Sequence, residues 1–231
     1  SSPGVGIGRV VLAQQTMDLA SVPERHTSDP DAEMQTFRQA LASVKQDMRN
    51  LGVGLEGKLS SEELALFNVY ISMLDDDSLG GEVIETIKSG QTAQSAWSSV
   101  ILKHVRTFRH MEDPYLRERA SDVEGLGKRV LGYLQQTDEK KKPLPRRIVL
   151  VGENLSATEL ADIPVDRLVG IVSLKGASSS HMAIVGRALG IPTVMGALDM
   201  PCAELEGKEL IVDGFTGDVV SHATRTLKRA Y

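Results

Sequence analysis

The chain has 231 residues, of which 41% are hydrophobic and 25% charged, and its formal net charge at pH 7 is −5. These values are typical of a globular protein of one or two domains and exclude a disordered chain. The mildly acidic balance argues against nucleic acid as the main partner, and the single cysteine, Cys202, excludes an intrachain disulfide. The sequence has no apolar run long enough to span a bilayer and no signal peptide, so we expect a cytoplasmic protein without membrane association.

The first three-fifths of the chain predict a short strand followed by a helical bundle. Residues 1–15 carry Pro3 and alternate Gly residues near their start and then read GRVVLA, which predicts a strand. Asp29-Pro30 is typical of a helix start, and Ser60-Ser61-Glu62-Glu63 predicts the cap of a second helix. Further amphipathic runs span about residues 93–110 and 115–134. Four helices with short connections predict an antiparallel four-helix bundle.

A polar, proline-marked boundary at residues 140–145 precedes a change of pattern. Short apolar runs with β-branched residues follow at 148–151, 168–174 and 210–212, with helical stretches between them, which indicates an α/β unit. The early strand has no partner in its own neighbourhood and most simply joins this unit. We therefore predict an α/β plus α fold, with an α/β domain of residues 1–21 and 145–231 interrupted by a helical domain of residues 22–144.

One histidine, His181, stands at the predicted start of a helix that follows the strand at 168–174. Free backbone N–H groups and the helix dipole at such a position favour an anion and a neutral imidazole. A neutral histidine beside an anion-binding backbone suits covalent phosphoryl transfer through phosphohistidine. The alternative is a histidine that only caps the helix or packs in the core.

Several side chains near His181 are candidates for its phosphate environment. Gly176 permits close approach of the backbone, Ser179 and Ser180 offer hydroxyl donors, and Arg187, six residues further on, is expected to point to a similar face. The serines have an alternative role as helix caps, and Arg187 as a solvated surface residue. The remaining histidines show no metal-ligand spacing, so we predict no metal site and a structural or surface role for each: His26, His104, His110 and His222.

The second predicted helix carries an apolar stripe at steps of three and four residues, formed by Phe67, Tyr70, Met73 and Leu74, and the run Asp75-Asp76-Asp77 follows it. A stripe of this kind most often faces a core. Methionine and tyrosine are also suited to a protein interface, and aspartates would guide a basic partner.

Four segments resemble Enzyme I of the phosphoenolpyruvate:sugar phosphotransferase system, above all its nitrogen-related branch. GASSSHMAIVGRALGIPTVMG (residues 176–196) resembles the phosphohistidine segment, and LSATELADIPVDRLVGIV (155–172) the segment leading into it. PGVGIG (3–8) and YLRERASD (115–122) resemble the family's opening and one of its bundle helices. The resemblance covers nearly the whole chain and matches the N-terminal half of the family.

The resemblance implies a small swivelling phosphohistidine domain with an inserted helical subdomain. It implies that His181 accepts phosphate, through Nε2, and that Ser180 stands directly before it. Sugar-branch relatives have a threonine that orients the histidine; Leu160 occupies that position here, which leaves Thr158 as the nearby candidate. Carrier docking would involve Phe67, Tyr70, Met73, Leu74 and Arg119, the last matching a family residue near that interface.

The implied activity is that of a phosphoenolpyruvate-protein phosphotransferase with an HPr-like carrier, called NPr in the nitrogen branch. Phosphoenolpyruvate and Mg²⁺ would bind in a C-terminal barrel that this sequence lacks. We therefore expect a monomeric fragment without a cofactor of its own that does not autophosphorylate alone. Two alternatives stay open: a docking module without chemistry, and the truncated Enzyme I-like module of a multiphosphoryl carrier for dihydroxyacetone kinase. The helical insertion argues against the related domain of pyruvate phosphate dikinase or phosphoenolpyruvate synthase.

Overall fold

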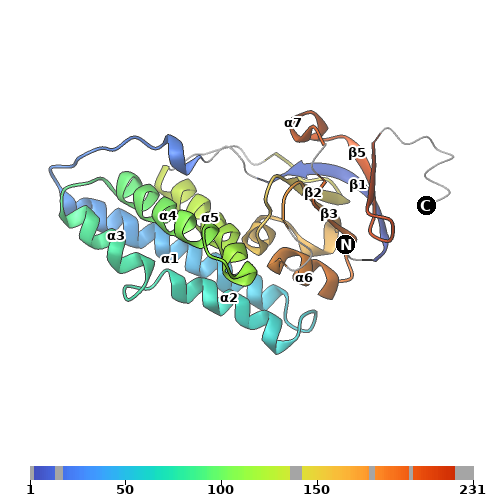
Figure 1. The fold of residues 1–231 in the computed structure, drawn as a ribbon, viewed down its shortest axis with the longest axis horizontal. Coiled ribbons are helices and arrows are strands. Elements are labelled where there is room, and N and C mark those ends of the chain that lie inside the picture. Colours follow the sequence, from blue (N-terminus) through green and yellow to red (C-terminus); the bar gives the residue numbers. More distant parts are fainter. Residues whose placement is uncertain (1–2, 14–17, 136–141, 177–179, 198–199, 222–231) are drawn as a thin grey trace. The chain divides into compact units, whose positions relative to one another are not determined.

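The computed structural model describes residues 3–13, 18–135, 142–176, 180–197 and 200–221. These residues form two compact units: an α/β unit, from residues 3–13 and 142–221, and a helical unit, from residues 18–135. The α/β plus α fold class predicted from the sequence is confirmed, because the helical unit interrupts the α/β unit along the chain (Figure 1). The domain limits at 21/22 and 144/145 stay a prediction of where each part folds independently, which truncated chains would test.

The helical unit contains five α-helices among its described residues, one more than the sequence predicted. They are α1 (Pro30–Gly54), α2 (Ser61–Met73), α3 (Leu79–Lys88), α4 (Ala93–Arg109) and α5 (Pro114–Gln135). A short 3-10 turn, η1 (Leu19–Ser21), packs against α4 and α5. Figure 1 shows α1, α4 and α5 side by side, in agreement with their contacts.

The starts of these helices follow from local hydrogen bonding. The Asp29 side chain accepts a hydrogen bond from the Ala32 amide at 3.1 Å, and Pro30 opens α1. At α2 the predicted capping box is complete, because Ser60 and Glu63 each accept from the other's backbone N–H at 3.2 Å. Such caps satisfy N–H groups that have no partner inside the helix.

Helix α3, which the sequence did not predict, has two glycines, Gly80 and Gly81, in its first turn. They are required by the tight corner after α2: a Cβ at Gly80 would stand 2.6 Å from the Leu74 carbonyl oxygen, and one at Gly81 1.9 Å from that of Asp76. The periodicity that marks α3 was present, since Leu79, Val83, Ile84 and Ile87 are all buried. Packing of two helix ends therefore overrode the low helix propensity of glycine.

The α/β unit is built on one six-stranded sheet in the order β4-β3-β2-β1-β5-β6. Its strands are β1 (Val5–Leu12), β2 (Ile148–Gly152), β3 (Leu168–Ser173), β4 (Thr193–Met195), β5 (Glu209–Asp213) and β6 (Asp218–Ser221). Strands β1 to β4 pair in parallel, whereas β5 is antiparallel to both β1 and β6. The early strand thus joins the α/β unit, beside β2. The strands β4 and β6 are additions to the predicted pattern.

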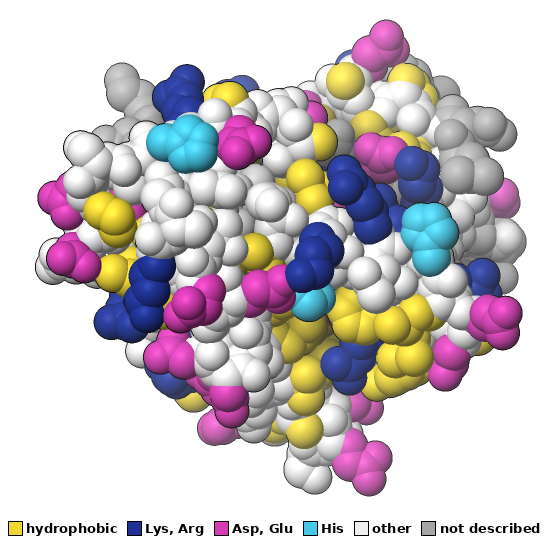
Figure 2. All heavy atoms as spheres, turned by 60° about the vertical axis from the view of Figure 1, so that its left-hand side comes forward, with side chains coloured by type: hydrophobic (Ala, Val, Ile, Leu, Met, Phe, Trp, Pro, Cys, Tyr) yellow, Lys and Arg dark blue, Asp and Glu magenta, His cyan; other side chains and the backbone are white. Residues whose placement is uncertain are grey.

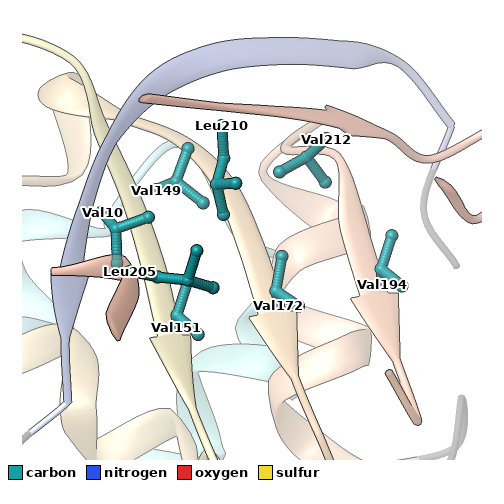
Figure 3. Close-up of a cluster of buried hydrophobic side chains, with 8 residues drawn as sticks. All are labelled: Val10, Val149, Val151, Val172, Val194, Leu205, Leu210 and Val212. Atoms are coloured by element: carbon teal, nitrogen blue, oxygen red, sulfur yellow. The ribbon is translucent and has the colours of Figure 1, made fainter. Parts of the chain in front are cut away.

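Each face of the sheet has its own cover. One face carries a cluster of buried aliphatic side chains from β1 to β5, closed by Leu205 of the short helix α7 (Cys202–Leu205) (Figure 3). On the other face α6 (His181–Ala188) packs against β4, and a Cβ at Gly186 of α6 would stand 2.4 Å from Thr193 Oγ1. The sheet is therefore buried on both sides, as its continuous apolar strands indicate.

On the face drawn in Figure 2, positive and negative side chains are interspersed, as expected for a chain of small net charge. Among the helices of the described residues, none combines the length and the apolar character that a bilayer crossing requires.

Candidate functional site

The structure places His181 at the first residue of α6, directly after the loop that follows β3. Ser180 is the N-cap: its Oγ accepts a hydrogen bond from the Ala183 amide at 3.2 Å, and its carbonyl accepts from the Ile184 amide at 3.0 Å. The imidazole is half-buried. The capping role of Ser180 uses its hydroxyl as an acceptor, so the O–H remains able to donate to a second group.

The loops that follow three parallel strands are joined at one edge of the sheet. After β2 and β3, the Leu174 amide donates to the Gly152 carbonyl at 3.0 Å and the Lys175 amide to the Glu153 carbonyl at 2.7 Å. After β4, the Gly196 amide donates to the Ser173 carbonyl at 2.9 Å. Because α6 starts from this edge, His181 lies at the carboxyl ends of the strands, where open α/β sheets bind their ligands.

Gly176 has a conformational role in this edge. Its φ is +107°, and a Cβ there would stand 2.9 Å from Met195 Cε. Only glycine adopts this backbone without strain. Lys175, immediately before it, forms an ion pair with Glu153. Ser179, the other predicted phosphate donor, lies outside the described residues.

Thr158 is buried in the 3-10 turn η2 (Ala157–Asp162), which packs against α6. Its Oγ1 lies 2.7 Å from Ser156 Oγ, which also accepts from the Thr158 amide at 3.1 Å. The hydroxyl pair is therefore held rigidly beside the helix that carries His181. Orientation of the imidazole by Thr158 stays a prediction.

Arg187 lies six residues after His181 on α6. Six residues in an ideal α-helix correspond to about 9 Å along the axis and about 240° around it, which argues against a shared face. The structure places Arg187 exposed in the last turn of α6. A direction of Arg187 toward the phosphoryl oxygens therefore stays a prediction. A contact from Arg187 to a partner's carboxylate stays a prediction.

Among the described residues, no group of three or more His, Cys, Asp and Glu side chains is placed to hold a metal ion. His104 lies 2.7 Å from Glu82 Oε2, and Lys103 binds the other oxygen of that carboxylate. The hydrogen bonds from Lys103 and then His104 hold the pKa of Glu82 below its ordinary value. His104 thus belongs to a charged cluster of the helical unit.

Three of the predicted carrier contacts lie in the core of the helical unit. Phe67 is 2% exposed, Tyr70 1% and Leu74 0%, and the Phe67 and Tyr70 rings meet edge to face with centroids 6.1 Å apart. Tyr70 OH donates a hydrogen bond of 2.8 Å to Asp122 Oδ1 of α5. Burial, and then the negative charge of Asp122, raise the pKa of Tyr70 well above its ordinary value. These three side chains are therefore corrected to core residues, since a partner would reach them only by opening the bundle.

Helix α2 carries a second apolar stripe, which was not predicted from the sequence. Leu66, Val69 and Met73, again at steps of three and four, lie partly exposed or exposed on the helix, with Val69 37% exposed. We call these three residues the α2 stripe. The spacing of these apolar residues is visible in the sequence. A surface helix buries one apolar stripe in the core, so a second stripe on the same helix predicts an exposed apolar face.

Arg119 lies one turn before Asp122 on α5 and is partly exposed. Its guanidinium stacks over the exposed Tyr115 ring at 5.5 Å and donates to Tyr115 OH at 3.3 Å. Of the aspartates after α2, Asp75 is bound by Lys45 at 2.7 Å, whereas Asp76 and Asp77 are exposed. Met73, Arg119 and these two aspartates thus remain available on the surface of the helical unit.

The chain combines a sheet that has a histidine at the start of its covering helix with a helical insertion after the first strand. Comparison of the sequence with known protein families identifies the group to which it belongs. The chain belongs to the PEP-utilising enzyme family: residues 1–119 match the model of its N-terminal part, and residues 144–217 that of its mobile domain. A solved structure described as the N-terminal domain of Enzyme 1 – Nitrogen is similar over 100% of this chain and 94% of its own length, with a TM-score of 0.68 and 35% identity.

Two curated relatives extend the comparison. The chain is 36% identical over its whole length to an Escherichia coli (strain K12) protein named for the phosphoenolpyruvate-dependent phosphotransferase system. It is 28% identical to the phosphoenolpyruvate-protein phosphotransferase of Staphylococcus aureus (strain MRSA252). The chain spans 31% and 41% of the length of these two proteins. The resemblance to Enzyme I of the phosphotransferase system is thereby confirmed.

Proposed function

We propose that His181 accepts a phosphoryl group on Nε2 and passes it reversibly to a histidine of an HPr-like carrier, of the NPr type in a nitrogen-related system. The observation that carries this proposal is the place of His181, the first residue of α6 at the carboxyl edge of the sheet, in a chain of the PEP-utilising family. Phosphoenolpyruvate would be the ultimate donor, and it and Mg²⁺ would bind outside this chain.

In the proposed reaction a P–O bond of the donor breaks as an N–P bond forms at His181, and the donor leaves as the enolate of pyruvate. In the second step that N–P bond breaks as one forms on the carrier's imidazole. For phosphoryl transfer, the protein chiefly has to position the two reacting groups and to stabilise negative charge on the phosphoryl oxygens. The N-terminus of α6 supplies the positive end of the helix dipole, and the Ser180 O–H can donate to a phosphoryl oxygen.

For carrier docking we propose the surface formed by the α2 stripe with Arg119. The stripe offers an apolar contact that methionine can adapt, and stacking on the exposed Tyr115 ring pre-orients the Arg119 guanidinium on α5. Arg119 lies one turn before Asp122 on α5, and the Asp122 carboxylate accepts the hydrogen bond from Tyr70 of α2. Asp76 and Asp77 would attract a basic rim on the carrier and raise the association rate.

The test is transfer of labelled phosphate from a phosphorylated carrier, HPr and NPr in separate reactions, to the full chain. Wild type should acquire acid-labile label, as phosphohistidine does, and His181→Ala should acquire none. His26→Ala is the matched control, because His26 is an exposed residue of the helical unit whose nearest carboxylate is 3.9 Å away. It should be labelled like the wild type.

Carrier binding is measured in parallel on the same proteins. Binding without label on the wild type would reduce the chain to a docking module and end the catalytic proposal. Label on His181→Ala would move the acceptor to another residue. Incubation with phosphoenolpyruvate and Mg²⁺ alone should leave all variants unlabelled.

A further inference from the structure

A second feature of the α/β unit lies away from His181: a surface groove of about 500 Å³ at the opposite edge of the sheet. Its walls come from β1 (Ile7 to Arg9), from the segment before β2 (Pro145 to Arg147) and from Glu209 at the start of β5. The parallel strands begin at this edge and end at the edge that carries His181. A five-residue strand separates the two by about 15 Å.

Three arginines line this groove against one carboxylate, in a chain whose net charge is −5. Arg9 lies in β1, and the other two arginines lie just before β2. Arg9 pairs with Ile148 in the β1–β2 register, and its amide donates to the Arg147 carbonyl at 2.9 Å. The sequence before β2 is itself basic, reading KKKPLPRR over residues 140–147. The positive charge here is thus concentrated rather than scattered.

Two of the guanidinium groups are held in place by backbone carbonyls. Arg9 Nη1 donates to the Gly207 carbonyl at 3.0 Å, and Arg147 Nε donates to the Ile7 carbonyl at 3.0 Å. Each guanidinium keeps further N–H donors after its one bond. Anchoring of this kind lowers the cost of ordering the side chains when an anion binds.

The third guanidinium, that of Arg146, has no hydrogen bond or ion pair with any residue in the part of the chain that the structure describes. Gly8, which also lines the groove, packs closely on the segment before β2, since a Cβ there would stand 2.8 Å from the Arg147 carbonyl oxygen. Side chains with aliphatic surface, Ile7 and Pro145, complete the lining. The groove therefore combines an unused cation, two oriented cations and an apolar wall.

We propose that this groove binds a small organic dianion, a phosphate monoester or a dicarboxylate, with its charged oxygens on the arginines. Arginine matches both groups through paired N–H donors, and the volume suits a small molecule. The site is separate from His181, so the proposal goes beyond phosphoryl transfer and would survive the loss of that function.

The test is a titration of the full ¹⁵N-labelled chain with inorganic phosphate and, separately, succinate, at constant ionic strength. Saturable shifts are expected at the amides of Ile7 and Gly8 and at the arginine Nε signals. Arg146→Gln should weaken binding about tenfold, the loss of one charge-assisted contact. Arg38→Gln is the charge-matched control on α1 and should bind normally, as should His181→Ala.

A response to phosphate alone identifies a phosphoryl ligand, and a response to succinate alone a dicarboxylate. Chemical-shift changes that rise linearly with the concentration of both probes, without saturation, would overturn the proposal. The arginines would then serve only to connect neighbouring segments of the sheet. Saturable binding that Arg146→Gln does not weaken would overturn it too, because the anion would then sit elsewhere.

Discussion

The buried hydrogen bond between Tyr70 and Asp122 is the sharpest test of how the helical unit is held together. Tyr70→Phe removes only the hydroxyl, and with it the hydrogen bond of 2.8 Å that the Asp122 carboxylate, 5% exposed, accepts from Tyr70. Loss of a hydrogen bond to a buried charged group costs about 2 kcal/mol. If the free energy of unfolding falls by about 2 kcal/mol for each 1 M of urea, this loss lowers the urea midpoint of unfolding by about 1 M.

The assay is urea unfolding followed by fluorescence of Trp97, the single tryptophan, which is fully buried on α4 and donates to the Gly127 carbonyl at 2.8 Å. It reports on the helical unit alone. Tyr133→Phe is the control: Tyr133 also donates to a carboxylate, Asp47, but is 42% exposed, so water replaces its bond and less than about 0.5 kcal/mol is expected.

The same pair predicts an alkaline effect. The folded state raises the pKa of Tyr70, whereas the unfolded chain ionises near pH 10, so the stability that this group contributes is full below about pH 10 and falls as pH rises further. The difference between wild type and Tyr70→Phe should therefore shrink above that pH. Equal stability of Tyr70→Phe and wild type at pH 7, or an equal loss in Tyr133→Phe, would refute the reasoning.

Two further predictions concern α2 and α6. Val69→Ser, in the α2 stripe, should weaken carrier binding about fivefold by calorimetry with the urea midpoint unchanged, while Val53→Ser, 65% exposed on α1, should leave binding intact. Equal effects of both variants would exclude the stripe as the docking surface. Gly186→Ala should cost about 1 to 3 kcal/mol and speed hydrogen exchange in α6, because its Cβ would stand 2.4 Å from Thr193 Oγ1. Gly54→Ala, which meets nothing within 4 Å, is the control, and exchange in α6 that is no faster in Gly186→Ala would contradict the packing argument.

The sequence predicted those elements whose signals are local. The capping box at Ser60 and Glu63, the start of α1 at Asp29 and Pro30, and the place of His181 after a buried strand depend on neighbouring residues, and the structure has each of them. The sequence also predicted that the first strand joins the α/β sheet, because a strand without a neighbour in its own part of the chain has to pair with strands elsewhere.

What the sequence could not decide was which side of a helix meets the core. On α2 both Tyr70 and Val69 stand in apolar stripes, and only the packing against neighbouring helices buries the first and exposes the second. The same limit hid α3, whose glycines serve a close approach of two chain segments rather than a helix end. In the candidate site, the hydrogen bond between the Thr158 and Ser156 hydroxyls could not be predicted, because it depends on the backbone geometry of the turn η2.

The pairing of β1 with β2 has a consequence for how the chain is made. Arg9 finds its partner Ile148 only after the whole helical unit has been synthesised, which at ribosomal rates takes on the order of 10 s. During that delay β1 is an unpaired edge, and its alternating glycines, Gly4, Gly6 and Gly8, lower its tendency to pair with other chains. We therefore expect the helical unit to fold first on the ribosome: a nascent chain stalled with residue 135 outside the exit tunnel should already bury Trp97 while β1 exchanges its amide protons freely.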